Sequence, residues 1–162
     1  MQRITSGGCQ CGAVRYSTSA ALSGAHICHC RMCQKAVGNA FAALAAVPRD
    51  ALKWTRGTPA TFASSDQVVR GFCAACGTPL FYDYVAGNRI NLTIGSLDDP
   101  ASVPPERQFG SEGRQPWFAG LAALPDEGAT ETTMAAIAPA IAASNSQHPD
   151  HDTGQWLTKD DV

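Results

Sequence analysis

The chain has 162 residues, with 12 Lys and Arg against 14 Asp and Glu, a formal net charge of −2. This length favours one domain with a substantial core, and the near-neutral charge without a basic block excludes a surface that follows nucleic-acid phosphates. No apolar run approaches the ~18 residues that a membrane helix needs, and residues 1–6 lack the apolar segment of a secretory signal. We therefore expect a cytoplasmic protein with neither a nucleic-acid nor a membrane partner.

Glycines and short alternating segments dominate the first part of the chain. Residues 6–12 form a glycine-flanked loop, and residues 13–18 alternate apolar and polar side chains, which predicts a half-buried strand. Residues 19–27 are predicted as a connection of small residues. Residues 34–37 favour one or two helical turns that end at Gly38.

Most of the remaining elements are predicted to be strands. Residues 48–52 favour a single turn. The other segments are a strand at 41–47, a hairpin-like return at 54–62, and strands at 67–72, 79–84 and 88–94. The last two strands flank a short turn and show the period-two pattern of a sheet. This order, with cysteine-bearing turns between the strands, predicts a mostly β domain with short helices.

The composition changes after Pro125, where the chain becomes rich in alanine. Residues 130–144 predict a helix that Pro139 kinks or interrupts. The polar segment that follows is expected to be loosely held or docked onto a neighbour. We therefore divide the chain into a mostly β domain, residues 1–126, which contains all the cysteines, and a C-terminal helix with a polar tail, residues 127–162.

Seven cysteines carry the main functional signal. They fall into three tight groups: Cys9 and Cys11; Cys28, Cys30 and Cys33; and Cys73 and Cys76. An odd number of thiols in a cytosolic chain fits a disulfide framework poorly. Spacings of one or two residues are typical of metal ligands. The sequence therefore predicts metal binding, with buried or redox-active thiols as the alternative.

Seven thiols divide naturally into four and three. A structural zinc site is closed by four protein ligands, whereas a catalytic site keeps one position free. The spacing leaves the partition open, because Cys9 and Cys11 can join either Cys73 and Cys76 or two of the central three cysteines. We prefer the first division, since it keeps the compact group at residues 28–33 whole. We call the resulting sets the four-thiol cluster (Cys9, Cys11, Cys73 and Cys76) and the thiol triplet (Cys28, Cys30 and Cys33).

Two other functional classes compete with an enzyme. In a binding or scaffold protein both zinc ions are structural, and a side chain or partner closes the triplet. Four histidines are candidates for that closing ligand: His26, His29, His148 and His151. Of these, His29 stands between two ligands, so its side chain is expected to face away from the ion. A redox protein would use the Cys73-x-x-Cys76 pair, but no βαβ context surrounds that pair.

Charged and aromatic residues near the cysteines have mainly structural interpretations. Three arginines can pair with substrate carboxylates through two parallel hydrogen bonds, although solvated surface positions are the favoured interpretation: Arg15, Arg31 and Arg70. The large aromatic side chains are expected to pack rather than to bind substrate: Trp54, Phe81, Tyr82 and Trp117.

Four motifs in a fixed order resemble the glutathione-dependent formaldehyde-activating enzyme family, whose domain centromere protein V shares. They are residues 8–16 (GCQCGAVRY), 28–33 (CHCRMC), 72–80 (FCAACGTPL) and 95–100 (GSLDDP). Residues 116–117 and 124–125 also fit, so the resemblance covers about residues 6–125. One position departs from the pattern, since Gln108 stands where family members often carry histidine.

The resemblance implies a zinc-containing β-tent fold and a division of labour between the thiols. It assigns the four-thiol cluster to a structural zinc and the thiol triplet to a catalytic zinc, which we expect to be the more labile of two ions. It further implies a carbon–sulfur lyase-type reaction on an adduct of a thiol, glutathione, and an aldehyde, in the direction of S-hydroxymethylglutathione. If the replaced histidine shapes the pocket, Gln108 implies a different substrate. The histidine and aspartate stretch at residues 147–152 is also similar to some bacterial members and carries no assigned role.

Overall fold

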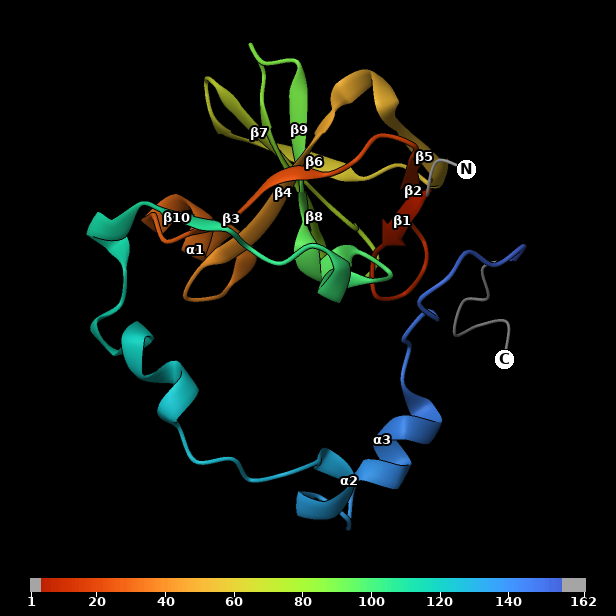
Figure 1. Ribbon diagram of the computed structural model, residues 1–162. Helices are drawn as coiled ribbons and strands as arrows, with labels where there is room; N and C mark the ends of the chain where they lie inside the picture. Colours follow the sequence, from red (N-terminus) through yellow and green to blue (C-terminus); the bar gives the residue numbers. More distant parts are fainter. Residues whose placement is uncertain (1–3, 156–162) are drawn as a thin grey trace.

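Two β-sheets form the body of the computed structural model, which describes residues 4–155 (Figure 1). The smaller sheet has the strand order β1-β2-β5, and the larger has the order β10-β3-β4-β9-β8-β7-β6. Nearly all neighbouring strands are antiparallel, and β10 alone among the described pairs runs parallel to its neighbour, β3. The strands are β1 (Thr5–Gly8), β2 (Arg15–Thr18), β3 (Ser23–Cys28), β4 (Ala42–Pro48), β5 (Leu52–Arg56), β6 (Ala60–Ser65), β7 (Val68–Phe72), β8 (Pro79–Tyr84), β9 (Arg89–Thr93) and β10 (Arg107–Phe109).

Short helices occupy the connections and the C-terminal part. The α-helices are α1 (Arg31–Val37), α2 (Thr130–Thr133) and α3 (Ala138–Ser144). The 3₁₀ helices are η1 (Arg49–Ala51), η2 (Ile94–Ser96), η3 (Pro100–Ser102), η4 (Ser111–Gly113) and η5 (Pro116–Ala123). No helix in residues 4–155 has the length and apolarity needed to cross a membrane. The prediction of a mostly β fold with short helices is confirmed.

The apolar core positions both groups of cysteines. Alternating strand residues place Tyr16, Leu80 and Leu92 in a main core, where each is 0% exposed. This core also includes two members of the four-thiol cluster, Cys9 and Cys73. A smaller apolar cluster beneath α1 contains Cys33 of the thiol triplet. Each candidate metal centre therefore lies at the edge of a packed core rather than on a free loop.

The central strand predictions agree with the structure, but two others were wrong. The strands expected at residues 67–72, 79–84 and 88–94 are β7, β8 and β9. The return at 54–62 is not a hairpin, because β5 pairs with β2 while β6 pairs with β7. Gly57, with a φ of 59°, turns the chain from one sheet into the other. The connection expected at 19–27 mostly becomes β3, whose backbone is held by β4.

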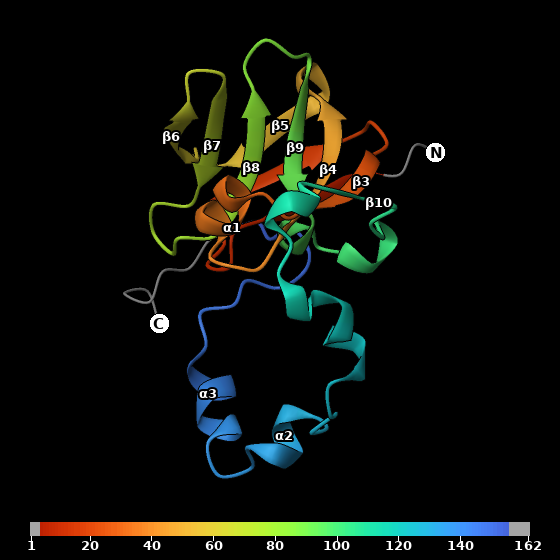
Figure 2. The same cartoon turned by 90° about the vertical axis from the view of Figure 1, so that its left-hand side faces the viewer.

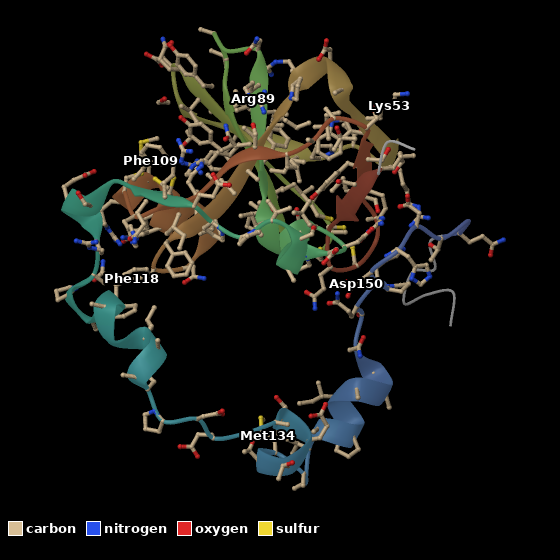
Figure 3. All side chains as sticks on the ribbon, in the orientation of Figure 1. Lys53, Arg89, Phe109, Phe118, Met134 and Asp150 are labelled. Atoms are coloured by element: carbon tan, nitrogen blue, oxygen red, sulfur yellow. The ribbon has the colours of Figure 1, made fainter. Side chains whose placement is uncertain are left out.

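The alanine-rich segment forms two helices instead of one. The chain leaves α2 at Thr133 and enters α3 at Ala138, with Pro139 in the first turn of α3. Proline is tolerated there because first-turn N–H groups have no helical acceptor. Figures 1 and 2 both show α2 and α3 away from the sheets. In Figure 3, Met134 lies on this outer arch, far from Phe118, where the chain leaves the body.

The tail returns to its own chain. The His148 backbone N–H donates to the Gln10 carbonyl at 2.6 Å, and the Arg56 side chain donates to the Thr153 carbonyl. The stretch at 147–153 therefore docks beside the Cys9 loop instead of remaining loosely held. The division of the chain after residue 126 stays a prediction, and residues 156–162 of the expected tail lie outside the described residues.

Candidate metal centres

The four-thiol cluster forms where the loop between β1 and β2 meets the turn between β7 and β8. All four Sγ atoms lie within 4.8 Å of one another. The Cys9–Cys11 Sγ distance is 3.6 Å, and the Cys11–Cys73 Sγ distance is 3.9 Å. Four Zn–S bonds of about 2.3 Å at tetrahedral angles place the sulfurs about 3.8 Å apart. These thiols therefore fit a tetrahedral zinc ion.

Two similar turns present these sulfurs. Gly12 and Gly77 follow their cysteines with φ values of 78° and 79°, a left-handed conformation that glycine adopts without steric cost. The Gly12 N–H donates to the Cys9 carbonyl at 3.1 Å, and the Gly77 N–H donates to the Cys73 carbonyl at 2.8 Å. Each turn thus closes on its own first cysteine, which the glycine positions in the sequence anticipated.

The pKa values of the thiols in the four-thiol cluster are shifted in different directions. Burial raises the pKa of Cys9, Cys11 and Cys73. Burial also acts to raise the pKa of Cys76, but hydrogen bonds from the hydroxyl and backbone of Thr78 and from Cys11 outweigh it and lower this pKa to about 6. A nearby cation favours the thiolate form at every position. The cluster is therefore suited to a divalent metal.

The thiol triplet lies at the junction of β3 and α1. Cys28 ends β3, Cys30 is the N-cap of α1, and Cys33 belongs to the first helical turn. The Cys30 Sγ lies 3.5 Å from the Cys28 Sγ and accepts from the Cys33 backbone N–H at 3.5 Å. The three Sγ atoms form the second group that can hold a metal ion. The helix start thus brings together sulfurs that the sequence already placed within six residues.

A buried arginine completes the surroundings of the triplet. The Arg70 guanidinium, on β7, donates to the Cys33 Sγ at 3.3 Å and to the Ser64 hydroxyl at 3.1 Å, and it lies 5.0 Å from the centre of the Tyr82 ring. Arg70 is only 4% exposed. In the part of the chain that the structure describes, no salt bridge joins a carboxylate to Arg70, so its contacts are the Cys33 sulfur, the Ser64 hydroxyl and the Tyr82 ring.

Two thiols of the triplet have pKa values shifted in opposite directions. Burial raises the pKa of Cys28 to about 12, and the neighbouring Cys33 and Cys30 thiols raise it as well. Burial acts in the same direction on Cys30, but the Cys33 backbone N–H, the neighbouring thiols and the Arg70 charge outweigh it and lower the pKa of Cys30. A metal at this position would favour all three thiolates.

His29 points away from the triplet, as its position between two ligands predicted. Its Nε2 lies 2.9 Å from the Gln108 Oε1, and its ring packs edge-on against Phe118 and Phe41. The residue is 0% exposed. Its backbone N–H donates to the Phe109 carbonyl at 2.9 Å. Gln108 and Phe109 belong to β10, a strand that the sequence pattern did not reveal, and β10 fixes the loop from outside.

The proposed histidine ligands do not join either cluster. Among the described residues, both groups that can hold a metal consist of cysteines alone. The His26 Nδ1 lies 2.8 Å from the Gly24 carbonyl, and the His148 ring lies against the Arg56 guanidinium. A histidine that closes the triplet therefore finds no support in the geometry.

The surface interpretation of the arginines was wrong for two of the three. Arg15 is 3% exposed and donates to the carboxylates of Asp98 and Asp152. Arg70 is buried against the triplet. Only Arg31 is exposed, where it donates to the Gln34 side chain. No local pattern in the sequence separates these arginines, because their partners lie far along the chain.

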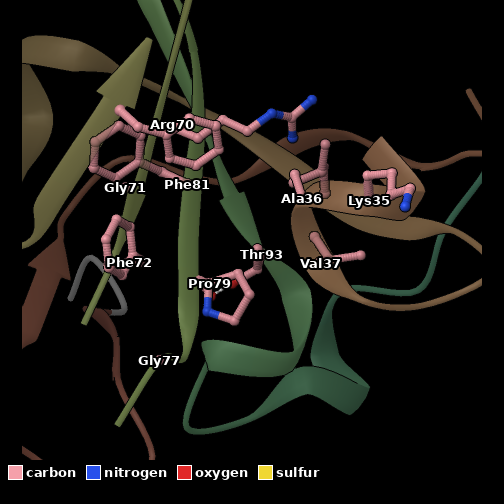
Figure 4. A pocket seen from close by; sticks show the side chains of 12 residues that line it. Lys35, Ala36, Val37, Arg70, Gly71, Phe72, Gly77, Pro79, Phe81 and Thr93 are labelled. Carbon is pink, nitrogen blue, oxygen red and sulfur yellow. Dashed lines mark hydrogen bonds between the residues drawn. The ribbon is translucent and has the colours of Figure 1, made fainter. Parts of the chain in front are cut away.

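A cavity of about 380 Å³ adjoins the triplet (Figure 4). Its walls include Lys35 and Val37 of α1, Phe62 of β6, and Arg70 and Phe72 of β7. Arg70 both lines the cavity and contacts Cys33, so this one residue connects the cavity with the candidate metal centre. An apolar cavity with a few polar groups is the usual form of a small-molecule site.

Comparisons with known proteins agree with this geometry. A family model described as glutathione-dependent formaldehyde-activating enzyme matches residues 4–111. A crystal structure of a Rhodobacter sphaeroides protein, a structural-genomics target, superposes with a TM-score of 0.50 at 22% sequence identity. That match covers 64% of this chain and 98% of the other, and at such identity it concerns the fold alone. No curated protein matches the chain.

Proposed function

Since the chain belongs to the glutathione-dependent formaldehyde-activating enzyme family, we propose that it is a zinc-dependent enzyme of the carbon–sulfur lyase type. Its substrates are a thiol, with glutathione as the first candidate, and a small aldehyde such as formaldehyde. The four-thiol cluster would hold a structural zinc, and the thiol triplet would hold a catalytic zinc. The structure describes no disulfide among the seven cysteines, which supports a cytoplasmic location, where thiols remain reduced.

The contrast between the two cysteine groups is the observation that carries this proposal. One group offers four sulfurs and the other offers three, within the described part of the chain. Structural zinc sites are saturated by protein, whereas catalytic sites keep one position for water or substrate. Among the described residues, the triplet is the group that leaves such a position. Arg70, which donates to Cys33 of the triplet, lines the 380 Å³ cavity, although Gly77 beside the four-thiol cluster lines it as well.

The reaction joins the two substrates without an oxidant or reductant. The sulfur of the thiol forms a bond to the aldehyde carbon, the carbonyl π electrons move to oxygen, and the thiol proton ends on that oxygen. When bound at the triplet, zinc supplies Lewis acidity and an exchangeable position for a sulfur ligand. Three thiolates exceed the charge of one divalent ion, and the Arg70 guanidinium offsets part of this excess at Cys33. His29, held by Gln108 and the aromatic rings, keeps the ligand loop in place.

The test is the rate of exchange between glutathione and formaldehyde. The uncatalysed reaction already proceeds, so exchange NMR is performed at low protein and substrate concentration with zinc-loaded protein. A Cys30→Ser variant is the control, because it keeps the four-thiol cluster and removes one triplet ligand. We expect the wild-type protein to accelerate exchange well above this control. Equal rates for the two proteins would reject the proposed activity.

A zinc-stabilised binding protein is the second candidate. Exposed apolar side chains on the outer arch favour it, for example Leu124 at 65%, Ile137 at 49% and Ile141 at 53% exposure. The two functions differ in how firmly the second metal is held. Two zinc ions per chain that fall to one when glutathione is added would favour the enzyme. Two ions that glutathione leaves undisturbed would favour the binding protein.

A further inference from the structure

The cavity beside the triplet carries a distinctive charge. Lys35 of α1 and Arg70 of β7 are both lining residues, and Figure 4 labels them on the two elements that border it. No aspartate or glutamate is among its lining residues. Lys35 is exposed, whereas Arg70 is 4% exposed and fixed by Ser64 and Cys33. The cavity therefore has one exposed and one buried positively charged residue in its wall.

The remaining wall is largely apolar. Phe62 is 45% exposed although it is a large hydrophobic residue, and Phe72 lies 6.3 Å from it between ring centres. Val37 and Pro79 line the cavity as well. An apolar wall lowers the local dielectric and strengthens the attraction between the two cations and an anionic ligand. It also accommodates the aliphatic part of an extended molecule.

The position of Arg70 relates this cavity to the proposed chemistry. The guanidinium touches Cys33, so a ligand that fills the cavity next to Arg70 extends toward the triplet. A thiol that bears a carboxylate several bonds from its sulfur can place the sulfur at the triplet and the carboxylate near Lys35. A neutral thiol of the same reactivity gains nothing from these charges.

We propose that the cavity formed by Lys35, Arg70, Phe62 and Phe72 binds the carboxylate-bearing end of the thiol substrate, so that the protein selects acidic thiols over neutral ones. This inference rests on the proposed thiol–aldehyde function. It assigns Lys35 as a specificity-determining residue, because its exposed ammonium group is free to meet a carboxylate. It assigns Arg70 a double role, since one guanidinium serves both the triplet and the cavity.

The decisive probe is S-methylglutathione, which keeps both carboxylates but has no free thiol for a metal. Its affinity for zinc-loaded protein is measured by titration calorimetry, beside that of its dimethyl ester. We expect the ester to bind more weakly. Lys35→Gln should weaken S-methylglutathione binding about 3–10-fold, as expected for one partly solvated charge-assisted contact, and Lys35→Glu should weaken it further. Lys53→Gln, an exposed lysine on β5 in the other sheet, is the matched control and should change nothing.

A second readout uses the reaction itself. Lys35→Gln should raise KM for glutathione without lowering kcat, and it should leave 2-mercaptoethanol kinetics unchanged, because that thiol has no carboxylate. Equal affinity of the ester and the acid, no binding of S-methylglutathione, or unchanged affinity in both Lys35 variants would overturn the inference. If the wild-type protein accelerates exchange but the Lys35 variants bind S-methylglutathione as wild type does, the cavity assignment is wrong and the proposed reaction stands. If S-methylglutathione binding depends on Lys35 but the protein does not accelerate exchange, the cavity assignment stands and the proposed reaction is wrong.

Discussion

The ion-pair network around Arg15 allows a quantitative test of the fold beside the four-thiol cluster. Arg15 and Asp98 are 3% and 11% exposed, and the guanidinium donates to the two carboxylate oxygens at 2.8 and 2.6 Å. Removing one partner of a buried pair costs about 3–5 kcal/mol, because the other charge stays buried without compensation. Asp152, 52% exposed, still accepts from Arg15 at 2.7 Å. We therefore expect Asp98→Asn to lower the free energy of unfolding by about 2–4 kcal/mol.

The same pair predicts a pH dependence. Burial raises the pKa of Asp98, but hydrogen bonds from Arg15 and Ser6 outweigh it and hold this pKa below its usual range. A carboxyl group whose folded pKa is depressed stabilises the protein fully above its unfolded pKa of about 3.9. That contribution disappears as the pH falls through the folded pKa. The difference in stability between wild type and Asp98→Asn should therefore be largest at neutral pH and shrink below about pH 4.

Urea unfolding of zinc-saturated protein at pH 7, followed by circular dichroism, measures the difference. The expected loss corresponds to a fall in melting temperature of roughly 5–15 °C for a chain of this size. Asp152→Asn is the matched control, and its half-exposed carboxylate should contribute no more than about 1 kcal/mol. An Asp98→Asn midpoint equal to that of wild type, or an equal loss in Asp152→Asn, would refute the reasoning.

Two further predictions concern the metal centres. Cys76→Ala should reduce the zinc content from two ions to one per chain and lower the melting temperature strongly, because a structural zinc can supply an apparent ~10–16 kcal/mol. Elemental analysis measures the zinc content, and calorimetry measures the melting temperature. A variant with the zinc content and melting temperature of wild type would contradict the four-thiol site. Gly110 has a φ of 66°, and a Cβ added there would lie 2.6 Å from the backbone nitrogen of Cys30 in the triplet. Gly110→Ala should therefore destabilise the protein by about 1–3 kcal/mol and weaken Co²⁺ binding at the triplet. Gly24→Ala is its control, with a φ of 58° but no atom within 4 Å of the added Cβ, so it should leave Co²⁺ binding unchanged.

The turns that carry the candidate metal ligands were predictable because their geometry is local. Ligands separated by one or two residues, followed by Gly12 or Gly77, already define a turn that points two sulfurs the same way. The alternation of apolar residues likewise predicted β7, β8 and β9. The spacing of the cysteines left open whether Cys9 and Cys11 group with Cys73 and Cys76. The packing of the sheets brings these two turns together.

The chain order and local spacing determined by themselves which residues could bind metal, and that these residues would belong to a mostly β fold. Tertiary structure alone decided what surrounds those sites. Arg70 meets Cys33 across 37 positions of sequence, and β10 supports the ligand loop by pairing with β3. Such contacts depend on strand register and on which sheet a strand enters, and no periodic pattern within one segment encodes either.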